Sequence, residues 1–158
     1  MVIIHKPVRG ISQQSLGRFV LRARKAAKLP GKVNVLLTSN QQVRSLNSRF
    51  RGQNKPTDVL SFPAWPIIEK DLAGDIVVSS EIAAENAGEF GHSTADEVKI
   101  LVLHGVLHLA GYDHETDRGQ MARIEARLRQ ELGLRDTLTG RAARAGGNSK
   151  HKAARRHR

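Results

Sequence analysis

The feature that most constrains the fold is the segment at residues 94–110, TADEVKILVLHGVLHLA, which predicts a buried helix. Apolar residues occupy nearly every side of this helix, a pattern typical of a helix inside a protein core. Thr94 and Glu97 have the spacing of a capping box, and Gly111 can end the helix because glycine adopts the left-handed conformation at little cost. The rest of the chain is expected to be organised around this segment.

Three histidines lie in and directly after the predicted helix, with the spacing H-x3-H-x2-G-x2-H. His104 and His108 are one turn apart on the same helix face, and a turn at Gly111 can bring His114 back towards them. If these were ordinary core histidines, each would need its own buried partner, because an unpaired polar group in a core costs a few kcal/mol. One shared metal ion satisfies all three side chains.

The three imidazoles predict a single metal ion, with zinc as the first choice and nickel or copper as alternatives. Three nitrogen ligands leave the fourth position of a tetrahedral ion open, which favours catalysis over a purely structural role. The spacing also resembles the zinc helix of the metzincin proteases, H-E-x-x-H-x-x-G-x-x-H. Gly105 stands where those enzymes have the glutamate that acts as general base, which is evidence against a protease. A zinc ion could still activate a water molecule for attack on another electrophile.

Length and cysteine content limit the architecture and the metal chemistry. The 158 residues have room for one domain with one moderately large core. There is no cysteine, so disulfides and thiolate metal sites are excluded, and any zinc must be bound through nitrogen and oxygen. No apolar run is long enough to span a membrane and the N-terminus has no signal-like apolar block, so a cytoplasmic protein is expected.

The net charge of +11 is distributed in three blocks. Residues 1–57 contain twelve Lys or Arg and no Asp or Glu, residues 58–140 have a net charge of −8, and residues 141–158 add seven Lys or Arg. The last block lacks apolar periodicity and is predicted to be a disordered basic tail, so the catalytic domain is assigned to residues 1–140.

The basic blocks favour a polyanion as partner: RNA, DNA or an anionic membrane surface. Binding of nucleic acid is favoured over the alternative that the basic surface only makes the protein soluble. With one Trp, one Tyr and four Phe, the composition does not predict an aromatic stacking platform, and contacts mostly to phosphate are expected.

Periodicity along the chain predicts alternating strands and helices before the histidine segment and one helix after it. The expected strands are residues 2–4, 33–37, 59–62 and 76–78. The expected helices are residues 12–28, a segment starting at Ser39, a segment from Ser79 or Ser80 to about Phe90, and residues 94–110. A last helix, with Thr116 and Asp117 as candidate caps, has its buried stripe at Met121, Ile124, Leu128 and Leu132.

Three separate segments resemble one known family. They are FRGQNKPTDVLSFP at residues 50–63, GDIVVS at 74–79 and HGVLHLAGYDH at 104–114. Together they are similar to the YbeY-type bacterial endoribonucleases, the rRNA maturation factors, and the resemblance extends over roughly residues 1 to 135. The third segment is the most specific, since all its eleven positions agree with the family's metal-site pattern.

The resemblance implies an α+β fold: a single domain with a mixed sheet of about four strands surrounded by helices, and a metzincin-like zinc helix beside a basic channel. It implies that His104, His108 and His114 bind one Zn²⁺ and that Arg51 is needed for activity, so that Arg51 and His114 are the expected catalytic residues. Asp113 could orient a histidine or accept backbone hydrogen bonds in its turn.

The implied activity is metal-dependent cleavage of single-stranded RNA in maturation of the 16S rRNA 3′ end and in ribosome quality control. Its expected partners are precursor 16S rRNA, the small ribosomal subunit and ribosome-associated proteins, with no membrane partner. Two alternatives stay open: an RNA-binding ribosome assembly factor with a structural zinc, and a metzincin-like metalloprotease with an unusual base.

Overall fold

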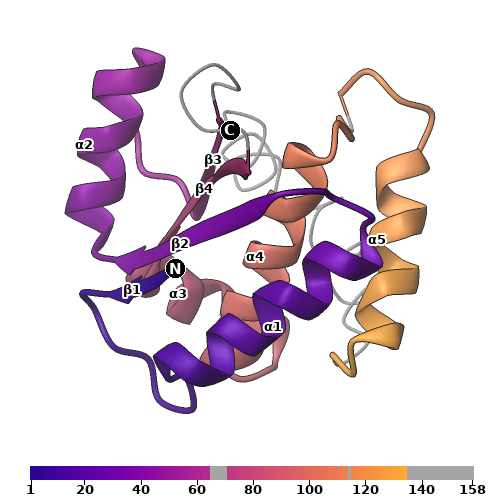
Figure 1. The fold of residues 1–158 in the computed structure, drawn as a ribbon. Helices are drawn as coiled ribbons and strands as arrows, with labels where there is room; N and C mark the ends of the chain where they lie inside the picture. Colours follow the sequence, from indigo (N-terminus) through magenta and orange to yellow (C-terminus); the bar gives the residue numbers. More distant parts are fainter. Residues whose placement is uncertain (65–70, 114, 135–158) are drawn as a thin grey trace.

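A computed structural model describes residues 1–64, 71–113 and 115–134 of the chain, which form a four-stranded sheet with helices on both faces (Figure 1). The proposed domain boundary at residue 140 and the predicted tail at 141–158 lie outside these residues. The predicted α+β fold with a mixed sheet of about four strands surrounded by helices is confirmed.

The sheet consists of β1 (Val2–Ile4), β2 (Lys32–Thr38), β3 (Val59–Pro63) and β4 (Leu72–Ser79). The strand order is β1-β2-β4-β3. β1, β2 and β4 are parallel, whereas β3 runs antiparallel to β4. β3 is therefore an edge strand, with β4 on one side only.

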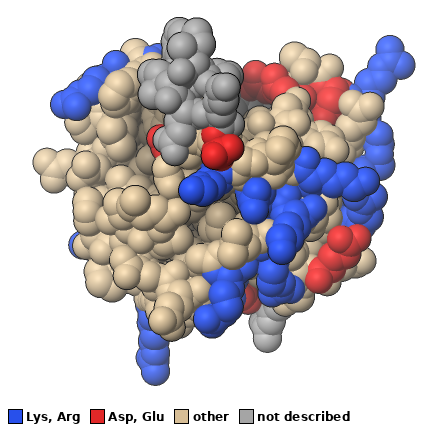
Figure 2. All heavy atoms as spheres, viewed as in Figure 1, with Lys and Arg blue, Asp and Glu red and all other residues tan. Residues whose placement is uncertain are grey.

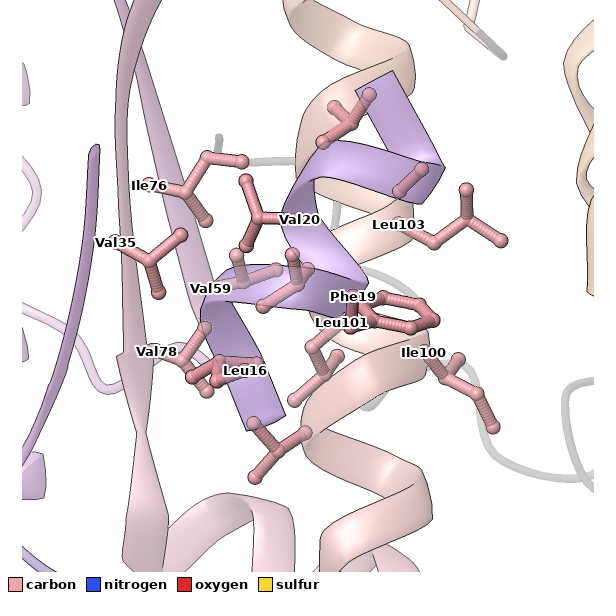
Figure 3. Close-up of a cluster of buried hydrophobic side chains, with 14 of the residues drawn as sticks. Leu16, Phe19, Val20, Val35, Val59, Ile76, Val78, Ile100, Leu101 and Leu103 are labelled. Carbon is pink, nitrogen blue, oxygen red and sulfur yellow. The ribbon is translucent and has the colours of Figure 1, made fainter. Parts of the chain in front are cut away.

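Five helices occur among the described residues. They are α1 (Gln13–Ala26), α2 (Asn40–Arg51), α3 (Ser80–Phe90), α4 (Thr94–Leu109) and α5 (Gln120–Glu131). The larger core lies between one face of the sheet and helices α1, α4 and α5, and Figure 3 shows side chains of α1, α4 and the strands meeting there. A smaller apolar cluster of Val43, Leu60 and Val77 joins α2 to the opposite face.

α4 is the most deeply buried helix, as its sequence predicts. Every residue from Glu97 to Leu107 except Lys99 is buried. The chain turns after the helix at Gly111, whose φ of 99° is in the left-handed region that glycine tolerates. Despite this apolar character, no helix in the described part of the chain is long and apolar enough to cross a membrane.

The predicted capping box at the start of α4 is wrong by one residue. The N-cap is Ser93, whose hydroxyl accepts a hydrogen bond from the Asp96 amide at 3.0 Å. Glu97 is instead drawn into a buried polar cluster, where its carboxylate contacts His92 Nε2 at 2.7 Å and Asn86 Nδ2 at 3.2 Å. This cluster ties α3 to α4 and fixes the rotation of α4 about its own axis.

Candidate metal centre

α4 brings the imidazoles of His104 and His108 together on one face. Their Nε2 atoms lie 3.1 Å apart and their ring centroids 4.8 Å apart, at an interplanar angle of 72°. His104 is buried, with 6% of its surface exposed, and His108 is half-buried. Two nitrogens that each bind zinc at about 2.0–2.1 Å in a tetrahedron are about 3.3 Å apart, so the observed spacing fits a shared ion.

Glu125 of α5 fixes the orientation of His104. One of its carboxylate oxygens lies 3.0 Å from His104 Nδ1, and the Arg129 Nη2 atom lies 3.7 Å from the same oxygen. When Nδ1 donates its proton to the carboxylate, the Nε2 lone pair points towards His108. Two facing lone pairs repel one another, so a proton or a cation has to lie between the two nitrogens. The donor set therefore fits a metal ion.

The third predicted ligand, His114, lies outside the described residues. Among residues 1–64, 71–113 and 115–134, no three His, Asp or Glu side chains form a group that could bind a metal. The neighbouring Asp113 shapes the turn: its carboxylate accepts a hydrogen bond from the Glu115 amide at 3.0 Å, and its carbonyl accepts from the Asp117 amide at 3.1 Å. The Asp113 carboxylate therefore accepts a backbone hydrogen bond within its turn, which is one of the two roles expected for it.

Arg51 is the last residue of α2, where Gly52 adopts the left-handed conformation that ends the helix. Its Nη2 donates to the Ser61 carbonyl, and its guanidinium carbon lies 5.4 Å from the centroid of the Phe62 ring. Burial lowers the pKa of Arg51 below its ordinary value, because desolvation disfavours the charged form. The Arg51 Nε is buried and has no hydrogen-bond partner in the described part of the chain.

Ser61 connects this arginine to the histidine helix. Its hydroxyl donates to the Gly105 carbonyl at 3.4 Å, while its own carbonyl accepts from Arg51. Since Gly105 directly follows His104, the guanidinium is two hydrogen bonds from the helix turn between the two imidazoles. Ser61 thus links Arg51, at the end of α2, to the backbone of the histidine helix on the other face of the sheet.

Packing explains why residue 105 is glycine. A Cβ atom at this position would lie 2.9 Å from Ile76 Cδ1 and 3.0 Å from the Ser61 hydroxyl oxygen. Position 105 therefore faces the sheet at van der Waals contact, where a glutamate side chain has no room. The position that supplies the general base in metzincins is used here for close helix-to-sheet packing, which weighs against the protease alternative.

An open groove of about 1150 Å³ begins directly after the histidine helix. It lies between the ends of α1 and α4 and the first turns of α5, and its charged lining comprises Lys28, Asp113, Asp117, Arg123 and Arg127. Figure 2 shows Lys and Arg side chains gathered over α1 and α5 on this side of the molecule. Three basic and two acidic side chains line the groove, so its charged lining has a net charge of +1.

Glu125 and Ser61 were not singled out from the sequence. Glu125 belongs to the last helix, and no sequence spacing relates it to His104, 21 positions earlier. The sequence assigned Ser61 to a strand but contained no indication that its carbonyl meets Arg51. The prediction that Asp117 caps the last helix is confirmed only in part. Its carboxylate accepts a hydrogen bond from the Met121 amide at 2.8 Å, but the N-cap residue is Gly119.

Fold and site define a single-domain α+β protein with paired imidazoles on a buried helix and an arginine at the adjoining sheet edge. Comparison with known families gives the same architecture a name. The family model described as Endoribonuclease YbeY matches residues 5–133, and the chain belongs to this family.

Individual relatives agree with this assignment. A protein of Koribacter versatilis named Endoribonuclease YbeY is 53% identical over 144 residues, covering 91% of this chain and 93% of the relative. Its namesake in Nautilia profundicola is 46% identical over 106 residues, covering 67% of this chain and 76% of the relative. The solution structure of a Thermotoga maritima protein is similar with a TM-score of 0.57 and 36% identity, covering 84% of this chain and 89% of that one.

Proposed function

We propose that the protein is a zinc-dependent endoribonuclease that cleaves single-stranded RNA and acts in maturation of the 16S rRNA 3′ end and in ribosome quality control, in the cytoplasm. Family membership supports an RNA-cleaving hydrolase, because the relatives are named endoribonucleases. The observation that carries the proposal is the His104–His108 pair, with Nε2 atoms 3.1 Å apart.

His104, His108 and His114 would hold the zinc ion, with Glu125 fixing the ring of His104. When bound, the zinc supplies a Lewis acid for a phosphate oxygen and a water molecule whose pKa is lowered to about 7. In the tautomer in which His104 Nδ1 donates to Glu125, Nε2 is the nitrogen left to bind the ion. Burial of His104 keeps this geometry rigid and limits competition from water.

Arg51 would bind the phosphate that is cut. Its guanidinium stays positively charged at neutral pH even with a lowered pKa, and it presents several donors in one plane. The hydrogen bond to the Ser61 carbonyl orients the group. As the phosphorus becomes five-coordinate, the added negative charge is stabilised by this cation in a partly desolvated setting.

The decisive experiment measures cleavage of a single-stranded RNA spanning the 16S 3′ end by protein of known zinc content. The parent chain should cut the RNA, whereas His114→Ala and Arg51→Ala should each lose most of the activity, with Arg51→Ala retaining its zinc. His5→Ala and Arg18→Ala, which alter exposed side chains remote from the imidazole pair in sequence, serve as matched controls and should cut at the parent rate.

Equal activity in all five proteins would indicate a contaminating nuclease and contradict the proposal. If the parent bound the RNA tightly without cutting it, the alternative of a non-enzymatic assembly factor with a structural zinc would replace the endoribonuclease.

A further inference from the structure

An exposed aromatic side chain stands beside Arg51. Phe50, in the last turn of α2, has 62% of its surface exposed, which is unusual for a large apolar residue that packs against other side chains. Its ring meets that of Phe62 edge to face, with centroids 5.8 Å apart and an interplanar angle of 69°. Two of the four phenylalanines, which composition alone gave no reason to place together, thus form one aromatic pair at the surface.

The backbone around this pair is firmly held. The Gly52 amide donates to the Ser48 carbonyl at 3.1 Å, and the following Gln53 amide donates to the Asn47 carbonyl at 3.2 Å. The fully buried Asn47 side chain donates to the Lys55 carbonyl at 3.1 Å and so secures the next part of the loop. Phe50 is therefore presented to solvent on a fixed support, at small entropic cost for a partner that covers it.

Phe50 lies on a helix that contains basic but no acidic residues. α2 contains Arg44, Arg49 and Arg51 and no Asp or Glu. The Arg49 guanidinium carbon lies 6.0 Å from the centroid of the Phe50 ring. A shallow groove of about 410 Å³ continues along the exposed side of α2, lined by Gln41, Arg44, Ser45, Ser48, Arg49 and Asn54. This lining offers charge and hydrogen bonds for phosphates and sugars.

We infer that Phe50 is a stacking platform for an unpaired base of the RNA substrate, next to the phosphate bound by Arg51, and that Arg49 and Arg44 contact phosphates further along the strand. The inference rests on the proposed function. Alternation of an aromatic ring with arginines suits a single-stranded nucleic acid, whose bases and phosphates also alternate. An acidic protein segment would satisfy the arginines but would leave the exposed ring without a matching surface.

The test is binding of a fluorescein-labelled 12-nucleotide 2′-O-methyl RNA to the zinc-loaded full chain, followed by fluorescence anisotropy, with the RNA verified intact after each titration. Phe50→Ala should weaken binding about 10-fold, equivalent to about 1.4 kcal/mol, since stacking is worth about 1–3 kcal/mol per base. Phe50→Leu should weaken binding equally, because leucine has no π-face. Phe50→Trp should keep the affinity of the parent chain. Leu21→Ala, which removes an exposed apolar but non-aromatic side chain from α1, is the control and should change affinity less than about 2-fold.

A set of RNAs with a single abasic nucleotide at successive positions identifies the stacked base. At one position, the missing base should cost the parent protein about 10-fold in affinity and cost Phe50→Ala nothing further, because the interaction is already absent. Unchanged affinity in Phe50→Ala, parent-like affinity in Phe50→Leu, or an additive loss at every abasic position would overturn the inference. A protein partner for Phe50 would then be the better explanation.

Cleavage assays on the same variants separate this inference from the proposed function. Phe50→Ala should raise KM with little change in kcat, whereas Arg51→Ala should lower kcat. If the parent protein cuts RNA and Phe50→Ala has parental KM and affinity, only the stacking inference fails. If the parent binds RNA through Phe50 without cutting it, the endoribonuclease proposal fails and the binding surface remains.

Discussion

Helices α2 and α4 cover opposite faces of the same sheet and differ in nearly every physical property (Figure 1). α4 is apolar and almost wholly buried, whereas α2 buries only Val43 and Asn47 and exposes most of its polar and basic side chains. The imidazole pair lies on the most deeply buried helix. Arg44, Arg49 and Arg51 lie on α2, which is largely exposed to solvent. Changes in α4 should therefore affect stability and metal binding, whereas changes in α2 should affect the binding and cleavage of RNA.

The largest effect should follow Gly105→Glu, which restores the metzincin spacing in α4. The Cβ of the glutamate would lie 2.9 Å from Ile76 Cδ1, and its carboxylate would be buried where there is no space for it. The free energy of unfolding should therefore fall by about 4 kcal/mol or more. Thermal denaturation followed by circular dichroism measures this. Gly88→Glu in α3, where nothing lies within 4 Å of an added Cβ, is the matched control and should melt near the parent temperature. A parent-like melting temperature for Gly105→Glu would mean that α4 packs far less tightly than described.

Next in size is His108→Ala, which removes one imidazole of the pair while leaving its half-buried site in place. Bound zinc should fall from about one ion per chain to almost none, because two remaining protein ligands bind zinc weakly. Elemental analysis after dialysis gives the stoichiometry, and added zinc should no longer raise the melting temperature. Retention of the full zinc content would exclude His108 as a ligand.

A smaller effect is expected for Glu125→Gln, which keeps the shape of the side chain facing His104 Nδ1 but removes its charge. Zinc affinity should fall about 10- to 100-fold, as is usual when a carboxylate partner of a metal-binding histidine is lost. Competition with a chelator measures the change. Glu131→Gln, a half-exposed carboxylate on the same helix that contacts Arg127, should leave zinc affinity unaltered. Equal affinity in both variants would make the Glu125 contact a packing feature only.

The smallest effects should come from single charges on α2. Arg44→Gln or Arg49→Gln should each reduce the slope of log affinity against log salt concentration by about 0.7, which is the contribution of one phosphate contact on a single strand. Titrations at several salt concentrations provide the slope, and Arg18→Gln on α1 is the control of equal charge. Unchanged slopes in both variants would mean that Arg44 and Arg49 do not contact phosphates, and the contrast between α2 and α4 would be weaker.

Local patterns were sufficient to predict the elements of this fold. The buried helix, the histidine spacing and all four strands follow from periodicities of a few residues, and the mixed sheet agrees with the family resemblance. The cap of α4 could not be predicted with the same certainty, because Ser93 and Thr94 are both suitable caps. The choice is decided by Glu97, whose partners His92 and Asn86 come from outside the helix.

Contacts between distant segments account for the rest of the candidate site. The pairing of His104 with Glu125 depends on how α5 packs against α4, which no short-range pattern encodes. The aromatic pair of Phe50 and Phe62 likewise arises only when the end of α2 meets β3, so counting four phenylalanines could not reveal it. The sequence thus identified residues with reactive groups more readily than residues that position them.

The edge position of β3 gives Arg51 a further consequence. On an edge strand every second residue turns its amide and carbonyl outward, where they could pair with a strand of another molecule. Here Arg51 occupies the outward carbonyl of Ser61, and Pro63 has no amide proton to offer. The guanidinium proposed to bind RNA therefore also occupies a backbone carbonyl of the edge strand that β4 does not pair with. One side chain would thus serve both the pairing of the sheet edge and the binding of the substrate.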